Sequence, residues 1–325
     1  MDNQKILKYI QYSGLALLVF ILARLDHSNV YLYLRKSNYI YLLIGYPFLI
    51  LLVYIKGFRW NLMMRKQNVR LSYMKTFYIY LWAFYFGVIT PGRVGEVSKA
   101  FYVKNEFKSF GDAFISVFLD RIVDVVTILI IVMFFIPIYG HDIINYNIYN
   151  YFIWFVLSVG FIFCLYKISY KKIINLLKRA FYYFTPTKYK NIAKQNVTDF
   201  TNYLTIFIRD NRLILISLVL SIFAFICQST FSYMILKSLS INMSFSYNMF
   251  CLGISSLVAL IPISISGLGY RELVMIYLFG NIGLPKEAAV IFSLSLFFIS
   301  IVLGLHGYLI NLLMVIFKKN NLNKI

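Results

Sequence analysis

The chain alternates long apolar runs with short segments that carry most of its charge. The apolar runs cover residues 9–23, 39–55, 73–90, 113–137, 151–166, 213–236, 245–263, 273–284 and 288–317. A helix needs about 20 apolar residues to cross the hydrocarbon core of a bilayer. A soluble domain carries roughly 25% charged residues, whereas this chain has 61% hydrophobic and only 14% charged residues. The runs therefore predict an all-α polytopic membrane protein with a single transmembrane domain over residues 1–325.

The charge of the chain, formally +20, is concentrated in the segments between the runs. A strongly basic chain can bind nucleic acid, but Lys and Arg in short loops between apolar runs follow the positive-inside rule instead. That rule predicts a multi-pass protein of the cell (inner) membrane with both termini, residues 56–70 and residues 167–212 in the cytoplasm. Within residues 167–212, apolar side chains recur at helical spacing. This fits a helix on the lipid headgroups or a solvated connecting helix equally well, and we expect no nucleic-acid partner.

The runs outnumber the crossings that these loops allow. Two apolar runs lie between residues 56–70, which are inside, and the loop at His141, which is outside, although one crossing suffices there. Between the outside loop at Lys237 and the inside C-terminus there are again more apolar runs than one crossing requires. The count is restored if residues 73–99 and 245–284 each enter the membrane, break at Pro or Gly, and return. We therefore expect about six spanning helices and two re-entrant helical hairpins.

The two halves of the chain, about residues 1–140 and 149–320, would then have opposite orientations. Such an inverted-topology repeat is a common plan in transporters, with the substrate site at broken helices. Irregular backbone at membrane depth is tolerated where protein buries it or water wets it, so the two breaks should face a shared cavity. The alternative is eight full spans, which requires residues 99–108 outside, against the charge rule.

Each predicted break joins glycines to an arginine and a glutamate. The sequences are Thr-Pro-Gly-Arg-Val-Gly-Glu at residues 90–96 and Ser-Gly-Leu-Gly-Tyr-Arg-Glu at residues 266–272. Glycine lets the backbone turn sharply and expose its N–H groups, and an arginine beside it forms a bidentate clamp for phosphate. The candidate substrate-binding residues here are Gly92, Arg93, Gly95, Gly267, Gly269 and Arg271, with Glu96 and Glu272 as charge partners or proton relay. The alternative is that the Arg and Glu residues only stabilise the breaks.

Three charged residues interrupt the run at residues 113–137. They are Asp120, Arg121 and Asp124. A charge at the centre of a spanning helix costs about 2.5–3.5 kcal/mol on insertion scales, so such residues usually face a cavity. Arg121 and Asp124 lie three apart on one helical face and can pair. Arg121 is a third candidate for an anionic headgroup, with Asp120 and Asp124 as charge partners or proton relay. The alternative is a buried ion pair that fixes helix packing.

No pattern in the chain predicts catalysis, a metal or a cofactor. The three cysteines lie in apolar runs without Cys-x-x-Cys or Cys/His spacing, and hydrolase, metalloprotease and nucleotide-binding motifs are missing from the sequence. We therefore expect a protein that is not an enzyme, with no catalytic residues, no metal and no cofactor.

A combination of these motifs resembles a known family. The matching segments are Arg59-Trp60, Pro91-Gly92-Arg93-x-Gly95-Glu96, Arg121-x-x-Asp124, and Pro262-Ile-Ser-x-x-Gly267-x-Gly269-x-Arg271-Glu272. They look like the lysylphosphatidylglycerol synthase transmembrane, flippase-like family, over nearly the whole chain. The synthases of that family carry a soluble aminoacyl-transferase domain after the membrane region, and this chain ends at Ile325.

The resemblance implies the flippase half alone: a transporter that moves an anionic or polyprenyl-linked lipid between the leaflets of the membrane. The expected partners are membrane lipids, and no oligomeric state is predicted. The alternative is a non-catalytic membrane accessory to a glycosyl- or aminoacyl-transferase that acts on lipids.

Overall fold

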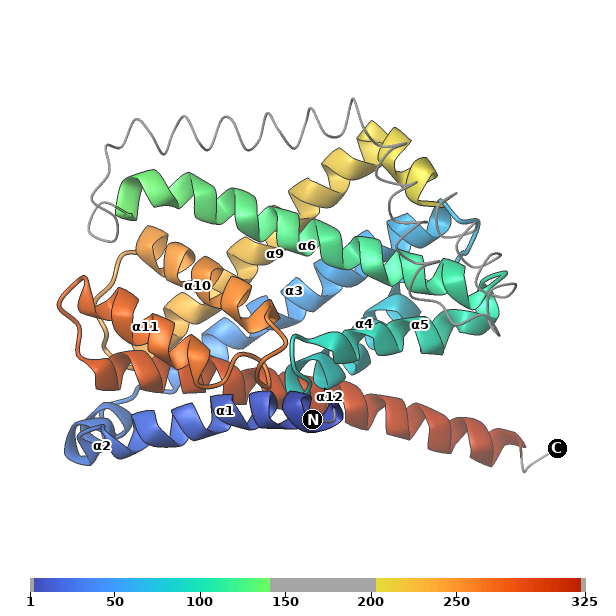
Figure 1. Cartoon of the computed structure of the whole chain (residues 1–325). Helices are drawn as coiled ribbons and strands as arrows, with labels where there is room; N and C mark the ends of the chain where they lie inside the picture. Colours follow the sequence, from blue (N-terminus) through green and yellow to red (C-terminus); the bar gives the residue numbers. More distant parts are fainter. Residues whose placement is uncertain (1–2, 141–202, 323–325) are drawn as a thin grey trace. The chain divides into compact units, whose positions relative to one another are not determined.

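Helices make up the regular structure of the part of the chain that is described, residues 3–140 and 203–322 of a computed structural model (Figure 1). The α-helices are α1 (Asn3–Ala23), α2 (His27–Arg35), α3 (Ile40–Arg65), α4 (Tyr73–Ile89), α5 (Ser98–Val103), α6 (Phe110–Tyr139), α9 (Asn211–Ser238), α10 (Phe245–Leu260), α11 (Tyr270–Gly280) and α12 (Lys286–Leu322). Two 3₁₀ turns, Val94–Val97 and Lys104–Glu106, flank α5.

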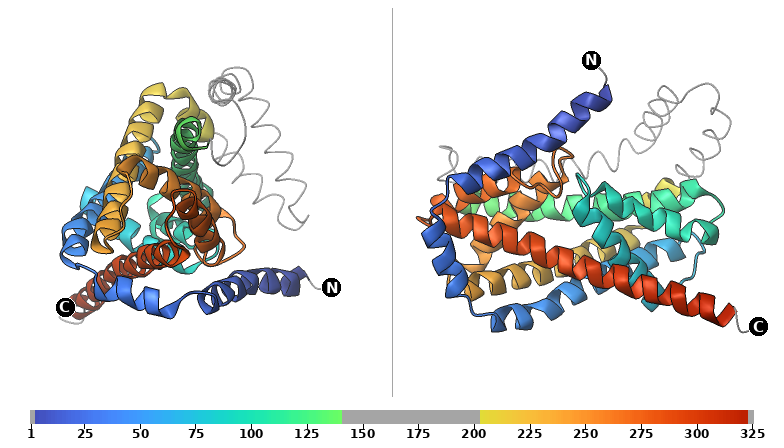
Figure 2. Two further views of the ribbon diagram at one scale, coloured as in Figure 1. Left: turned by 90° about the vertical axis from the view of Figure 1, so that its left-hand side faces the viewer. Right: turned by 90° about the horizontal axis from the view of Figure 1, so that it is seen from below.

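Four of these helices are long and apolar enough to cross a bilayer: α3, α6, α9 and the Lys286–Ile310 part of α12. A fifth span is formed if α1 and α2 count as one broken helix, since Ser13–Ala23 and His27–Arg35 meet at 89° (Figure 2). The prediction of an all-α polytopic membrane protein is thus confirmed. The predicted span at residues 151–166 and most of the basic segment 167–212 lie outside the described residues. The choice between six spans with two hairpins and eight spans stays a prediction.

Helix α3 continues ten residues beyond the apolar run that predicted it. The run ends at Ile55, but the helix ends at Arg65, so the predicted basic loop at residues 56–70 is mostly helical. The reason is that Arg59, although charged, is fully buried and bound to carboxylates of α6. A charge that is neutralised inside the protein need not end a helix. The positive-inside rule placed Arg59 in a cytoplasmic loop because the rule takes no account of such neutralisation.

The described residues belong to two compact units that are not the two halves of the sequence. The first unit comprises Met1–Gly57, Met74–Ser98 and Phe223–Ile325, and the second comprises Phe58–Tyr73 and Lys99–Ile222. The first unit therefore draws on both ends of the chain, and it contains both predicted breaks. The predicted repeat, with halves at about residues 1–140 and 149–320, stays a prediction.

In the first unit, α11 packs against α1, α10 and α12. Close approach of the backbones depends on small residues. A Cβ atom at Gly269 would lie 2.2 Å from the carbonyl oxygen of Gly14 on α1, and one at Gly304 of α12 would lie 2.8 Å from the Cα of Tyr85 on α4. Small residues at helix crossings are the usual means by which membrane helices gain van der Waals contact.

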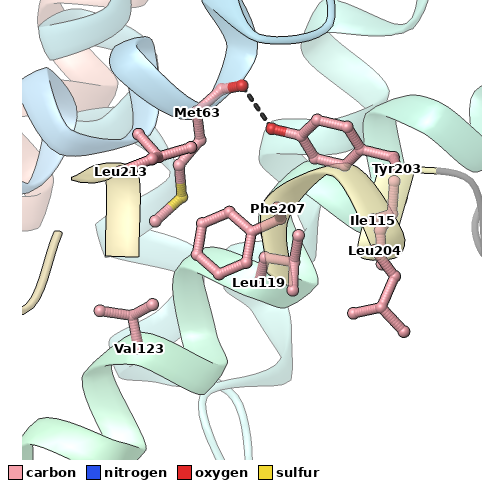
Figure 3. Packing of buried hydrophobic residues seen from close by; sticks show 8 residues of the cluster. All are labelled: Met63, Ile115, Leu119, Val123, Tyr203, Leu204, Phe207 and Leu213. Atoms are coloured by element: carbon pink, nitrogen blue, oxygen red, sulfur yellow. Dashed lines mark hydrogen bonds between the residues drawn. The ribbon is translucent and has the colours of Figure 1, made fainter. Parts of the chain in front are cut away.

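The second unit has an apolar core that joins α3, α6 and the helical residues 203–209. Its buried members are Met63, Ile115, Leu119, Val123, Tyr203, Leu204, Phe207 and Leu213 (Figure 3). The Tyr203 hydroxyl donates a hydrogen bond to the main-chain carbonyl of Met63 near the end of α3 (Figure 3). Burial raises the pKa of this hydroxyl, which therefore remains protonated and able to donate.

Candidate functional site

The first break follows α4 and is held by a threonine. The Thr90 hydroxyl donates to the Phe86 carbonyl at 2.6 Å and accepts from the Gly95 N–H at 2.7 Å. Gly92 and Arg93 both have left-handed backbone, with φ of 59° and 57°. Such a conformation is strained for arginine, and residues held this way often belong to functional sites.

The second break lies between α10 and α11. Gly267 and Gly269 have φ of 79° and 86°, which only glycine adopts readily, and Ser266 between α10 and Gly267 is also left-handed with φ of 49°. At the start of α11, Glu272 Oε2 accepts the Gly269 N–H at 2.6 Å. A carboxylate that binds a main-chain N–H at a helix N-terminus stabilises that terminus.

The two breaks lie against each other inside the first unit, although about 170 residues of sequence separate them. Pro91 and Ile265 form an isolated antiparallel β-bridge. A Cβ atom at Gly92 would lie 3.0 Å both from the Leu260 carbonyl oxygen and from the Pro262 side chain, so glycine is required for this approach.

A small cavity, with a volume of about 50 Å³, lies beside these breaks and is partly open to the outside. Its basic lining residues are Lys56 of α3, Arg93 of the first break and Arg271 at the start of α11. The other polar lining residues are Gln228, Ser255, Ser256 and Ser300. The apolar wall includes Leu49, Leu52, Phe84, Phe231, Leu252 and Leu296. The cavity thus combines hydrogen-bond donors with an apolar wall, as sites for amphipathic ligands do.

The guanidinium of Arg271 is held in place by three groups. Its Nε donates to the Ser293 hydroxyl at 2.8 Å, and its Nη2 donates to the Ser293 carbonyl at 2.9 Å and to Glu272 Oε1 at 3.0 Å. The Ser293 hydroxyl in turn donates to Glu272 Oε1 at 2.6 Å. The Phe297 ring lies 5.8 Å from the guanidinium carbon, within cation–π range. This network fixes the orientation of Arg271 at the edge of the cavity.

The predicted site residues divide between the two units. Arg93 and Arg271 line one cavity, and Gly92, Gly267 and Gly269 shape the breaks beside it. Gly95 and Glu96 lie at the end of the first break and pack closely against α4. A Cβ atom at Gly95 would lie 2.1 Å from the Phe86 carbonyl oxygen, and a Cβ atom at Gly87 would lie 2.4 Å from Glu96 Cγ. Glu272 holds Arg271 and does not itself line the cavity.

The residues Asp120, Arg121 and Asp124 of α6 belong to the second unit and are not among the residues that line this cavity. Arg121 is partly buried there. Asp124, which the sequence allowed to pair with Arg121, accepts a hydrogen bond from Arg59 Nη1 at 2.6 Å. Asp120 accepts from Arg59 Nη2 at 2.5 Å and from Lys99 Nζ at 2.7 Å, and all three of these side chains are fully buried.

This group of two cations and two carboxylates is packed on further side chains of the second unit. The Lys99 ammonium lies 5.1 Å from the centroid of the Trp60 ring. The Trp60 Nε1 donates to the Ser116 hydroxyl at 3.2 Å, and Arg59 Nη1 also donates to the Ser221 hydroxyl. We refer to Arg59, Lys99, Asp120 and Asp124 as the ion cluster.

Sequence reasoning assigned no role to Lys56, Gln228, Arg59 or Lys99 in the predicted sites. Lys56 and Arg59 were counted as loop charges, although their three-residue spacing among apolar residues is compatible with a continuing helix. Gln228 is a polar residue in the middle of an apolar run, which is a signal for a buried polar group. Lys99 lies a few residues after the first break, and nothing in the neighbouring sequence predicts that its side chain is buried.

The described residues contain no group of three or more His, Cys, Asp or Glu side chains that could hold a metal ion. The residues that line the cavity offer recognition by hydrogen bonds, positive charge and apolar contact.

Two comparisons bear on identity. A search of curated proteins finds no match to this chain. A family model, the lysylphosphatidylglycerol synthase TM region, matches residues 6–307. Among the described helices, that match leaves out only the start of α1 and the end of α12. With paired helix breaks, a basic cavity and this match over most of its length, the chain belongs to the family of lysylphosphatidylglycerol synthase transmembrane regions.

Proposed function

We propose that this protein is a flippase-like transporter that moves an anionic or polyprenyl-linked lipid between the leaflets of the cell membrane. The observation that carries the proposal is the cavity in which Arg93 and Arg271, one from each broken segment, line the same space. Membership of a family named for a lipid synthase supports a lipid-related role.

The lining suits a lipid phosphate. Arginine binds phosphate through parallel N–H···O bonds, and such charge-assisted bonds are roughly twice as strong as neutral ones. The leucines and phenylalanines of the wall suit the glycerol and the first carbons of the lipid chains. Broken helices next to a central site are typical of secondary transporters, whose repeats move around the site.

The remaining residues have supporting roles in this proposal. Glu272 and Ser293 orient Arg271, and Glu96 packs in the first break against Gly87. The ion cluster holds the second unit together. The transporter acts without a cofactor and is not an enzyme, and its two termini lie in the cytoplasm, as the basic segments indicate.

The test is transport of a fluorescent phosphatidylglycerol in proteoliposomes, measured by the fraction of label that a membrane-impermeant quencher reaches over time. We expect faster equilibration than in protein-free liposomes. Arg93→Ala and Arg271→Ala should each slow it by at least about tenfold, because each removes a charged hydrogen bond. Arg35→Ala is the matched control, since Arg35 is exposed at the end of α2.

Equal rates in wild-type protein and empty liposomes would overturn the transport function. If such an inactive chain were to co-purify with a lipid glycosyl- or aminoacyl-transferase, the accessory role would replace it. Unchanged transport in both arginine variants would overturn the assignment of the cavity while leaving transport in place.

A further inference from the structure

The charged groups that line the cavity are of one sign. Lys56, Arg93 and Arg271 are the ionisable residues of the lining, and no aspartate or glutamate from the described parts of the chain is among the lining residues. The uncharged polar lining residues, Gln228 and the three serines, can donate to a phosphate oxygen. A phosphate would find donors and positive charge on several sides, whereas an ammonium would find no lining carboxylate.

The carboxylate that contacts Arg271 is already occupied. Glu272 is fully buried, its Oε1 accepts from Arg271 Nη2 and from the Ser293 hydroxyl, and its Oε2 accepts from the Gly269 N–H. Recruiting Glu272 to a ligand ammonium would break bonds that fix Arg271 and the start of α11. Leaving a buried partner unsatisfied is costly, so Glu272 is a poor acceptor for a cationic headgroup.

We propose that the cavity selects lipids whose headgroup carries phosphate and no amine, and that it discriminates against aminoacylated and zwitterionic lipids. This inference rests on the proposed function and narrows its substrate class. The proposed substrate class excludes lysylphosphatidylglycerol, the lipid after which the family is named, because its lysyl group adds positive charge to the headgroup.

The discrimination has a repulsive and an attractive part, as specific sites commonly do. The headgroup phosphate is attracted to Arg93 and Arg271. A headgroup ammonium a few ångströms further along would face the same basic side chains, and like charges at short range in a partly dehydrated site repel strongly. Lys56 is the position at which the sign can be reversed, because it lines the cavity from α3 and is not one of the hydrogen-bond partners named above for Arg271, Glu272 and Ser293.

The experiment compares lipids in one proteoliposome preparation. The probes are trace fluorescent phosphatidylglycerol, phosphatidylethanolamine, lysylphosphatidylglycerol and a polyprenyl phosphate. We expect phosphatidylglycerol or the polyprenyl phosphate to cross at least about tenfold faster than either amine-bearing lipid. Which of the two is faster identifies the source of the phosphate. Lysylphosphatidylglycerol crossing as fast as both amine-free lipids would overturn the inference while leaving the transport function standing.

A charge-reversal variant gives a second readout. Lys56→Glu supplies the missing carboxylate, so we expect the ratio of lysylphosphatidylglycerol to phosphatidylglycerol transport to rise at least about fivefold. Lys56→Gln removes the charge without reversing it and should give an intermediate ratio. If the ratio is the same in all three proteins, the lining does not set specificity.

Lipid retention separates this inference from the proposed function. Native mass spectrometry of the purified protein, with equal amounts of phosphatidylglycerol and lysylphosphatidylglycerol added, measures binding without transport. If no lipid crosses but phosphatidylglycerol is retained at least about fivefold over the lysyl lipid, transport is overturned and the selectivity stands. Equal retention, or retention of neither, would overturn the selectivity as well.

Discussion

Charge is buried in both units of this protein, but in two different arrangements. In the second unit, Arg59 and Lys99 contact the carboxylates of Asp120 and Asp124 directly. In the first unit, Lys56, Arg93 and Arg271 line an open space, and the Glu272 carboxylate contacts Arg271.

The difference indicates what each region does. Opposite charges in contact at 2.5–2.7 Å satisfy one another, and they leave little for a ligand to gain. Basic side chains that line a cavity can reach an anion that enters it. We therefore assign the ion cluster to the stability of the second unit and, under the proposed function, the cavity to lipid binding. The following predictions test this division, starting with the largest expected effect.

Asp120→Asn should destabilise the protein by about 3–5 kcal/mol, because it removes the negative charge that Arg59 and Lys99 both contact in a fully buried place. The measurement is the melting temperature of the protein in detergent. Glu106→Gln, an exposed carboxylate in the same unit, should melt like the wild type. If Asp120→Asn melts normally but stops lipid transport, the ion cluster belongs to function and our division is wrong.

Gly269→Ala should disrupt the cavity without changing any charge. The position has φ of 86°, and the new Cβ atom would lie 2.2 Å from the Gly14 carbonyl oxygen. The backbone strain alone costs about 1–3 kcal/mol, and α1 and α11 must also move apart. We expect loss of transport and a lower melting temperature. Gly280→Ala is the control, since a Cβ atom there meets nothing within 4 Å.

Ser293→Ala should weaken lipid binding in the cavity, because it loosens Arg271 and its partner Glu272. It removes the hydroxyl that accepts from Arg271 Nε and donates to Glu272. The loss is about 1 kcal/mol, which corresponds to roughly fivefold in lipid binding. The check is lipid transport at several lipid concentrations, with Ser293→Thr expected to restore it. A Ser293→Ala variant with wild-type transport would show that Arg271 needs no such support.

The exposed pair Lys66–Asp210 in the second unit should have the smallest effect. The hydrogen bond from Lys66, and a second from the Leu213 N–H, lower the pKa of Asp210. Its stabilisation is therefore present above the unfolded pKa of about 3.9 and lost as pH falls through the lower folded value. Because the pair is exposed, the contribution is below about 1 kcal/mol.

The measurement is the melting temperature of wild type and Asp210→Asn, which keeps a good residue at the start of α9. The difference should be small at pH 7 and vanish once the pH is below the lowered pKa of Asp210 in the folded state, where Asp210 is protonated in both states. A difference larger than that of Asp120→Asn would invert the expected ranking of buried and exposed pairs.

The sequence by itself determined the membrane class, four of the spans and the positions of both breaks. These features are local: apolar run length fixes spans, and Pro91-Gly92 and Gly267–Gly269 provide the turns wherever the chain lies. The same local rules misplaced the end of α3, because they could not see that Arg59 is neutralised by α6.

The tertiary structure decided which distant residues meet. Only packing brings Pro91 to Ile265 and so places Arg93 and Arg271 around one cavity with Lys56. Only packing brings Asp120 into contact with Arg59 and Lys99, and Asp124 into contact with Arg59. The sequence shows which charged residues need a partner if they are buried. It does not show the partner, because the partner comes from a segment far away in the chain that is brought close only by folding.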